Sequence, residues 1–238
     1  MKKIKDLGEK IILLIVVMVI VLLNNFKAEI KEFLNPKEEI KISYNIDNIP
    51  EYNGEDYIII NDNKPFFKEE EKIKDSFEEY YSLDSLGRTT LAYANIGIDI
   101  MPEEKRERLY IKPSGFKIIK DNEIDGKYLY NRCHLIAYQL TGENENEKNL
   151  ITCTRHMNAE VMTEFENKVG NYIRKTKNHV LYRVTPYYDD DNLVAKGVNM
   201  EAYSIEDDGK GIEFNVFIYN VQKHYTINYK TGEAKKDN

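Results

Sequence analysis

Three segments in the C-terminal third of the chain alternate apolar and polar residues, which is the pattern of a β-strand with one buried face. Polar turn residues separate these segments at 189–192 and 207–211. Because short polar connections join antiparallel neighbours, the pattern predicts an antiparallel meander. The segments are 179–188 (HVLYRVTPYY), 193–205 (LVAKGVNMEAYSI) and 212–221 (IEFNVFIYNV), and 225–233 (YTINYKTGE) adds a short edge strand and a turn.

The middle of the chain changes from strands to a helix. Residues 129–132 and 146–152 each fit a strand. Residues 157–174 then carry apolar positions four apart, which is the spacing of a buried helix face. These positions are Met157, Val161, Phe165 and Val169. The pattern predicts an α+β fold, with an antiparallel sheet and an embedded strand–strand–helix (ββα) unit.

The part of the chain before this domain is acidic. Residues 36–80 hold 6 Lys against 13 Asp and Glu. Within it, 42–50 and 57–61 predict short strands, and 68–81 (KEEEKIKDSFEEYY) predicts a polar helix. We interpret 27–80 as an acidic stalk that leads into the first strands, and we place the main domain at 81–238.

Residues 11–23 form an unbroken run of 13 apolar residues, and four lysines precede it. Basic residues before an apolar run are the order of an export signal. No small residues of a cleavage site follow Leu23, so we expect an uncleaved signal-anchor over 1–26, with a cleaved signal as the alternative. In both cases the rest of the chain lies outside the cytoplasm. A buried core helix is less favoured, because the run has no polar face.

The charge and the cysteines narrow the function classes. A net charge of −7 excludes a broadly basic coat for nucleic acid, although residues 127–183 hold 9 Lys and Arg against 6 Glu and favour a local phosphate-binding surface. Two cysteines exclude a disulfide-rich scaffold and a Cys-based zinc module. Cys133 and Cys153 lie on segments predicted to be neighbours, and the sequence leaves both a disulfide and two buried thiols open.

The middle segment resembles the bacterial DNA/RNA non-specific endonucleases of the ββα-metal type, and within them the membrane-bound nucleases of DNA uptake. The family signature is Asp-Arg-Gly-His, followed by an asparagine-containing strand and then an asparagine on a helix. The likeness runs from about residue 83 to residue 233, and three elements match in order. They are Asn131-Arg132-Cys133-His134, Lys148-Asn149-Leu150-Ile151 and Met157-Asn158.

Phosphodiester hydrolysis needs a base for the attacking water and positive charge beside the phosphate. His134 is the expected base, because imidazole titrates near neutral pH. Arg132 lies two residues earlier, so a strand projects both side chains from one face, where they suit a single phosphate. A structural histidine at a strand end is the alternative for His134.

Asn158 is the expected ligand of Mg²⁺, or of Mn²⁺, through its amide oxygen. A neutral ligand leaves most of the charge of the ion available to the phosphate. The alternative for Asn158 is a helix N-cap. Asn149 matches a family position that supports the site, although asparagine at a strand end is also common in turns.

Glu166 matches a carboxylate that is important in the family. It follows Asn158 by eight residues, about 12 Å along a continuous helix, so both side chains cannot bind one ion directly. The sequence Thr163-Glu164-Phe165-Glu166 has the form of a capping box, which predicts a helix break there. Without a break, Glu166 acts through metal-bound water, and capping alone is the alternative.

Two further arginines and two departures from the motif complete the candidates. Arg88 and Arg155 are possible phosphate contacts, with surface ion pairs as the alternative. Asn131 replaces the usual Asp, and Cys133 replaces the usual Gly. Cys133 should face away from His134, which argues against a Cys–His catalytic pair.

Together these features predict a membrane-anchored, Mg²⁺-dependent endonuclease that cuts DNA and RNA without sequence preference. His134, Arg132 and Glu166 are its expected catalytic residues. The rival is a non-catalytic DNA-binding or receptor module that kept the nuclease fold, which Asn131 and the acidic overall charge favour. A secreted toxin or scavenging nuclease has the same chemistry with a different biology.

Overall fold

The computed structural model describes residues 49–237. The expected signal-anchor at 1–26 and most of the strand expected at 42–50 lie outside this range, so both stay predictions. Within 49–237, no helix combines the length and the apolar character that crossing a bilayer requires.

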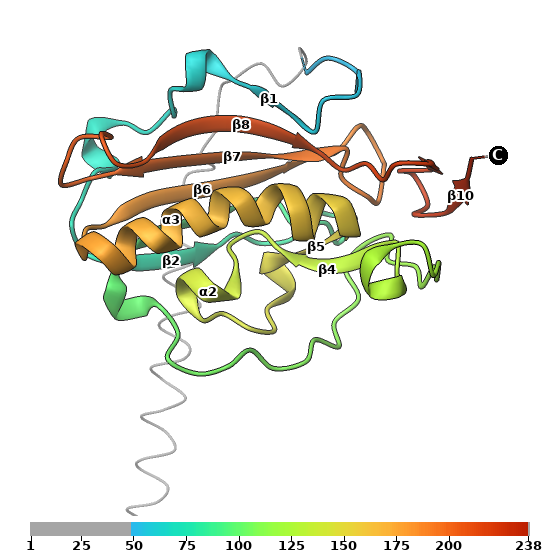
Figure 1. Cartoon of the computed structure of the whole chain (residues 1–238), viewed down its shortest axis with the longest axis horizontal. Coiled ribbons are helices and arrows are strands. Elements are labelled where there is room, and N and C mark those ends of the chain that lie inside the picture. The colour runs from blue at the N-terminus through green and yellow to red at the C-terminus, as the bar shows by residue number, and fades with distance from the viewer. Residues whose placement is uncertain (1–48, 238) are drawn as a thin grey trace, which may run out of the picture. The chain divides into compact units, whose positions relative to one another are not determined.

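Three long antiparallel strands form the centre of the main sheet (Figure 1), as the alternating pattern predicts. They are β6 (Val180–Tyr187), β7 (Gly197–Ser204) and β8 (Glu213–Tyr219). The register sets Met200 of β7 opposite Val184 on one side and Val216 on the other. One row of apolar side chains therefore crosses the sheet.

Three shorter strands complete a six-stranded sheet in the order β1-β8-β7-β6-β3-β2. They are β1 (Tyr57–Ile59), β2 (Phe77–Tyr80) and β3 (Ala92–Ile96). Both edge strands, β1 and β2, come from the acidic part of the chain before residue 81. That part therefore contributes directly to the sheet that carries the domain.

The polar helix expected over 68–81 is wrong. A 3₁₀ turn at Glu69–Glu71 precedes strand β2, which pairs with β3. The ring of Phe77 also packs against Tyr93, with 5.0 Å between their centres. These contacts are distant in sequence, and they outweigh the local helical preference because such propensities are weak.

The main hydrophobic core lies between one face of the sheet and helix α3 (Thr163–Thr176), which runs alongside the strands in Figure 1. The predicted apolar stripe points into this core, and its members are at most 6% exposed. They are Met157, Val161, Phe165 and Val169.

The opposite face of the sheet is covered as well, although an alternating pattern usually leaves one face in solvent. Arg183 and Glu201 are buried there and form an ion pair at 2.8 Å. The Glu201 carboxylate also accepts a hydrogen bond from the backbone N–H of Phe66 (2.7 Å), and the Arg183 guanidinium lies 4.7 Å from the ring centre of Phe67. Charged residues can be buried here because they are paired.

The ββα unit follows the predicted order. Strands β4 (Tyr130–His134) and β5 (Leu150–Thr154) form a separate two-stranded antiparallel sheet. A six-residue π-helix, Met157–Met162, then leads directly into α3. The connection between the two strands contains a short helix, α2 (Tyr138–Thr141).

The C-terminal segment forms another two-stranded sheet, from β9 (Tyr225–Ile227) and β10 (Ala234–Lys236). The strand expected at 225–233 is therefore no edge of the main sheet. Further 3₁₀ turns lie in the connections at Asn61–Asn63, Ile98–Ile100, Asp125–Lys127 and Glu147–Asn149.

Asn220, just after β8, ties the ββα unit to the main sheet. Its amide is fully buried, and its Oδ1 accepts a hydrogen bond from the backbone N–H of Thr154 (2.8 Å). Its Nδ2 donates to the carbonyl oxygens of Thr152 (3.1 Å) and Ala195 (2.9 Å). Because a buried amide that lost these partners would be left unsatisfied, β5 is held firmly at this end of the sheet.

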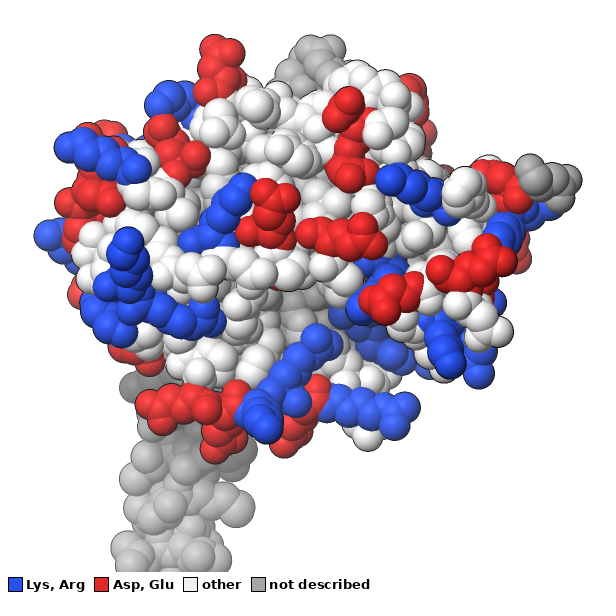
Figure 2. Space-filling view, in the orientation of Figure 1, with Lys and Arg blue, Asp and Glu red and all other residues white. Residues whose placement is uncertain are grey.

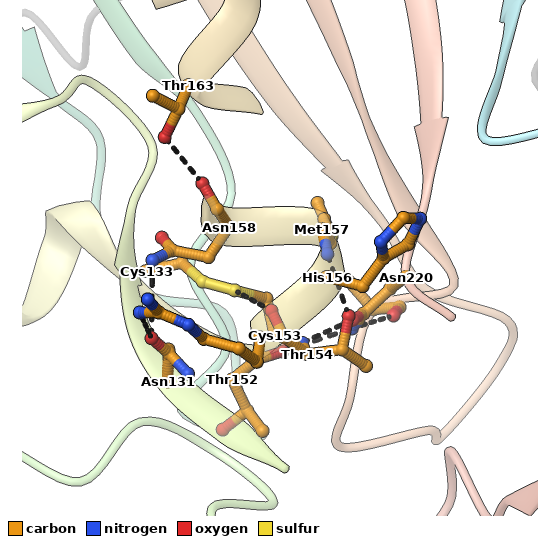
Figure 3. Close-up of a disulfide and its surroundings, with 12 residues drawn as sticks. Asn131, Cys133, Thr152, Cys153, Thr154, His156, Met157, Asn158, Thr163 and Asn220 are labelled. Atoms are coloured by element: carbon orange, nitrogen blue, oxygen red, sulfur yellow. Dashed lines mark hydrogen bonds between the residues drawn. A yellow bond between two sulfur atoms is a disulfide. The ribbon is translucent and has the colours of Figure 1, made fainter. Parts of the chain in front are cut away.

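Cys133 of β4 and Cys153 of β5 form a disulfide (Figure 3), which decides between the two alternatives that the sequence left open. Cys133 stands opposite Ile151, so the two cysteines are diagonal neighbours with Cα atoms 5.9 Å apart. Both are fully buried in the main core. The disulfide therefore links β4 to β5 covalently, on the side of these strands that faces the core.

Reduction of this disulfide should lower the free energy of unfolding by about 3 kcal/mol, because the bond joins residues 20 apart and restricts the unfolded chain. Urea unfolding of the protein with the disulfide intact and after its reduction measures the difference in the free energy of unfolding. Equal stability in both conditions would contradict this role of the bond.

Candidate active site

Arg132 on β4 points towards the loop that precedes the strand. Its Nε donates a 2.5 Å hydrogen bond to the carbonyl oxygen of Ile111, and its guanidinium lies 4.5 Å from the ring centre of Phe116. These contacts fix the direction of the side chain. Arg132 nevertheless lines an open cleft, so its remaining N–H groups can reach a phosphate.

His134 ends β4 with its ring almost buried, at 6% exposure. Its Nε2 lies 2.7 Å from the carbonyl oxygen of Asn144. A carbonyl oxygen can only accept, so Nε2 carries the proton and the neutral ring has its lone pair on Nδ1. Burial lowers the pKa of His134 to about 4, although the hydrogen bond to Asn144 opposes this, so the ring is neutral at pH 7. A neutral ring with a free Nδ1 is the form that a general base requires.

Asn149 lies behind His134 and is fully buried. Its Oδ1 accepts the backbone N–H of Ile136 (2.9 Å), and its Nδ2 donates to the carbonyl oxygen of the same residue (3.0 Å). The backbone N–H of Leu135 also bonds to the carbonyl oxygen of Asn149 (2.9 Å). These bonds hold the chain directly after His134, so Asn149 positions the ring without touching the cleft.

Asn158 lies in the π-helix and contacts β4 (Figure 3). Its Nδ2 donates a hydrogen bond to Oδ1 of Asn131 at 3.3 Å. The side-chain oxygen of Asn158 takes no part in this bond. Arg155 donates to the same Asn131 oxygen at 3.4 Å and forms an ion pair with Asp125 at 2.6 Å. Asn158 is no N-cap, because it is the second residue of the π-helix, and His156 occupies the N-cap position with helical backbone angles and no side-chain capping bond.

The helix break expected at Thr163 is wrong. Met162 and Thr163 both have helical backbone angles, and no side chain caps this position. The Thr163 hydroxyl instead donates to the carbonyl oxygen of Asn158 at 2.8 Å, within the π-helical turn. In an α-helix, residues seven positions apart lie on the same face. The π-turn adds one residue, so here residues eight positions apart lie on the same face. Glu166 therefore follows Asn158 on the same face.

The π-helix and α3 run in the same direction as β4, because β5 reverses the chain between them (Figure 1). From Asn131 to His134 the strand rises about 10 Å. From Asn158 to Glu166 the helix also rises about 10 Å, because the π-turn adds a residue and the rise is that of about seven α-helical residues. Asn158 lies beside Asn131, so Glu166 lies near the level of His134. The carboxylate and the imidazole thus belong to the same end of the site.

Glu166 is a buried carboxyl group, at 8% exposure. Burial raises its pKa to about 8, and the nearby positive charge of Arg106 partly offsets this. The same guanidinium also contributes to the low pKa of His134. Arg106 therefore lies within electrostatic reach of both His134 and Glu166.

Arg106 carries no motif or periodicity that would mark it as a site residue in the sequence. It belongs to the loop between the Ile98–Ile100 turn and β4, and no strand or helix period marks this loop. The one available signal is the local sequence Lys105-Arg106-Glu107-Arg108, which is rich in charge but typical of many surface loops. Only the tertiary structure brings this arginine beside the histidine.

Arg106, Arg132, Arg155 and Asn158 line one cleft of about 690 Å³. Its wall holds six Lys and Arg side chains and one acidic side chain, Glu107. In Figure 2, blue side chains gather over the lower part of the molecule, with red ones among them, where Figure 1 shows the ribbon of residues 101–132. The cleft therefore carries a positive charge that the whole chain does not.

Arg88 lies outside this cleft. It forms an ion pair with Asp84 at 2.6 Å and donates to the carbonyl oxygens of Asp190 and Asn192 at 2.7 and 2.9 Å. Its guanidinium also lies 4.6 Å from the ring centre of Tyr188. These contacts fit the ion-pair alternative, in which Arg88 joins two loops.

The donor groups of the site fit a hydrated Mg²⁺. Within the described residues, no three His, Cys, Asp or Glu side chains are arranged around a common ion. A site here would rest on the amide oxygen of Asn158, with the Glu166 carboxylate on the same helix face. Mg²⁺ prefers oxygen ligands and keeps several waters. A cation would also favour the ionised form of Glu166, which burial disfavours.

Known proteins resemble this chain over most of its length. The sequence model of the family described as "DNA/RNA non-specific endonuclease" matches residues 70–206, more than half of the chain. NucA from Streptococcus agalactiae with magnesium ion bound is 27% identical, with a TM-score of 0.67 over 75% of this chain and 86% of that one. The Sda1 nuclease with bound zinc ion is 25% identical, with a TM-score of 0.65 over 76% and 97% of the two chains.

The protonation of His134 predicts how stability depends on pH. The pKa is about 4 in the folded protein and 6.5 in the unfolded chain, so between these values the unfolded state binds more protons and stability falls with falling pH. The loss amounts to about 3 kcal/mol, from 1.36 kcal/mol per pKa unit. Urea unfolding measures the free energy of unfolding at pH 6.5 and at pH 4. Its decrease between the two pH values should be larger in the wild type than in His134→Gln by this amount. An equal loss in both proteins would contradict the neutral buried ring.

Proposed function

The chain belongs to the DNA/RNA non-specific endonuclease family, and on this premise we propose that it hydrolyses DNA and RNA with His134 as general base and one bound Mg²⁺. It is a metal-dependent endonuclease that cleaves phosphodiester bonds. The observation that carries the proposal is the hydrogen bond from Nε2 of His134 to Asn144, because it leaves Nδ1 as the proton acceptor. Magnesium in a structure of NucA supports the choice of ion.

His134 takes a proton from water at Nδ1 while the water oxygen attacks phosphorus and the bond to the leaving oxygen breaks. The leaving oxygen is then protonated from solvent. The low pKa of His134 keeps the ring neutral before this step, and Arg132 and Arg106 offer positive charge to the phosphate oxygens. Asn158 would hold the Mg²⁺, which would supply charge neutralisation to the phosphate.

Glu166 supports this arrangement from the buried side. Its carboxylate shares a helix face with Asn158 and lies within reach of the Arg106 charge. We assign it the role of orienting water at the ion, because its spacing from Asn158 is too long for both side chains to bind one ion directly. Metal binding would favour the ionised form of Glu166, since a cation lowers the pKa of a nearby carboxyl group.

The absence of a sequence preference follows from what lines the cleft. Its six Lys and Arg side chains can contact phosphates, which every nucleic acid carries. Asn131, which favoured a non-catalytic rival, accepts hydrogen bonds from Asn158 and Arg155 through its side-chain oxygen. An aspartate offers the same acceptor, so this departure from the family motif retains the contact with the proposed metal ligand.

Supercoiled plasmid should be degraded by the wild type with Mg²⁺ and should stay intact with EDTA. His134→Ala should lower the rate by about 10²- to 10⁴-fold, the usual contribution of a general base. His179→Ala is the matched control, because His179 pairs with Glu206 outside the cleft and should keep full activity. Gel electrophoresis over time gives all the rates.

Further variants separate the groups in the cleft. Arg106→Ala should lose activity, whereas Lys105→Ala, which changes an exposed neighbour outside the cleft, should keep it. Full activity of His134→Ala would contradict the mechanism. A wild type that retards DNA on a gel but never shortens it would contradict the enzymatic function and favour the binding module.

We also propose that the enzyme works outside the cytoplasm, anchored to the membrane by its N-terminal segment. The Cys133–Cys153 bond supports this location, because disulfides persist mainly in oxidising compartments. The apolar run at 11–23, with lysines before it, supports the anchor. A cleaved and secreted form is the alternative.

Protease added to intact cells should digest the nuclease domain, which should fractionate with the membranes. Nuclease found only in the medium would support the secreted form. A domain that is protected in intact cells and digested only after lysis would contradict the extracytoplasmic location. A cytoplasmic protein from the same cells serves as the control for lysis.

A further inference from the structure

The cleft beside the site contains exposed aromatic surface as well as positive charge. Tyr128 lines it with 42% of its surface exposed, and Phe116 contributes a second ring. Tyr128 lies in extended backbone two residues before β4, where it forms a bridge with Lys120. It stands about 13 Å along the extended chain from Arg132, at 3.3 Å per residue. The ring of Tyr128 thus lies in the same cleft as Arg132, at some distance from the phosphate that Arg132 would contact.

Cations accompany these rings. The Nζ of Lys120 lies 5.7 Å from the ring centre of Tyr128, and the guanidinium of Arg132 lies 4.5 Å from that of Phe116. Among the described residues, no other aromatic ring packs against Tyr128. Alternating rings and cations along a groove are the combination by which proteins bind single-stranded nucleic acid, where cations follow the backbone and bases stack on rings.

The small core beneath keeps this wall in place. Ile124, Leu129 and Tyr130 are buried there, with residues of β9 and β10 packed against them. Lys120 and Tyr128 therefore project from a supported turn rather than from a free loop. A ring on a rigid support loses little entropy when a base stacks on it.

The size and chemistry of the cleft favour unpaired nucleotides. Its volume of about 690 Å³ lies within the range of about 300–1,000 Å³ that is typical of small-molecule pockets, so it can enclose individual nucleotides. In a duplex, each base already stacks on its neighbours and pairs with the other strand. A ring can stack on such a base only after the base leaves the helix, which costs free energy.

We propose that this cleft binds single-stranded nucleic acid and that Tyr128 stacks on a base next to the cleaved phosphate. The proposal rests on the nuclease function stated above and specifies the form of its substrate. Contacts with phosphates can form with both single-stranded and double-stranded nucleic acid, whereas the stacking contact with Tyr128 can form only with a single strand. Tyr128 therefore determines specificity and takes no part in the chemical step.

The test compares a labelled oligonucleotide that cannot pair with itself and the same strand annealed to its complement. The value of kcat/KM with Mg²⁺ is measured on both for the wild type, Tyr128→Ala and Tyr128→Phe. Tyr52→Ala is the matched control, because Tyr52 is 40% exposed and lies outside the cleft. Binding of the same two substrates in EDTA is followed by fluorescence anisotropy.

Tyr128→Ala should reduce kcat/KM and affinity for the single strand by about 5- to 150-fold, the range that stacking of one base contributes. Its values for the duplex should stay within about twofold, and Tyr128→Phe and Tyr52→Ala should behave as the wild type. Equal losses on both substrates, or no loss on the single strand, would overturn the proposal. If the wild type cleaves neither substrate, the nuclease function fails, and the anisotropy measurements still decide whether Tyr128 selects single strands.

Discussion

The antiparallel pairing of β4 with β5 determines where the proposed catalytic groups lie. One strand ends at His134, and the other leads through the π-helix to Asn158 and Glu166. Because β5 reverses the chain once, the helix returns alongside β4, with Asn158 at Asn131 and Glu166 further towards His134. The disulfide holds the two strands together from the core side, and Asn220 fixes β5 to the main sheet. A shift of one residue in this pairing would turn Arg132 and His134 to the wrong face.

Burial acts in opposite directions on the two titratable groups at the far end of the site. It lowers the pKa of His134 and raises that of Glu166, because in each case the charged form loses its hydration. The histidine is thereby kept neutral, as a base must be. The pKa of the Glu166 carboxyl group stays at about 8 even with the positive charge of Arg106 nearby, and a bound cation would favour its ionised form. Both groups are buried and neither lines the cleft itself. Neighbouring groups with separated pKa values are typical of acid–base catalysis.

The two departures from the family motif have structural explanations. Asn131 uses its side-chain oxygen to accept hydrogen bonds from Asn158 and Arg155, which aspartate would also do, although with a full charge. Cys133 occupies a position that faces the core and finds Cys153 on the neighbouring strand. Both substitutions therefore act on how the ββα unit is held together, and neither removes a group that faces the cleft.

Hydrophobic patterning by itself determined the β6–β8 meander, the ββα order and the buried stripe from Met157 to Val169, because each depends on a period that neighbouring residues fix. The motif also indicated His134, Arg132 and Asn158. Tertiary contacts alone decided the rest. Residues 77–80 became a strand because β3 offered a partner, and the continuous turn at Thr163 replaced the expected break. The tautomer of His134, the place of Arg106 and the closed disulfide depend on groups that folding brings together from distant segments, and no local pattern encodes such an encounter.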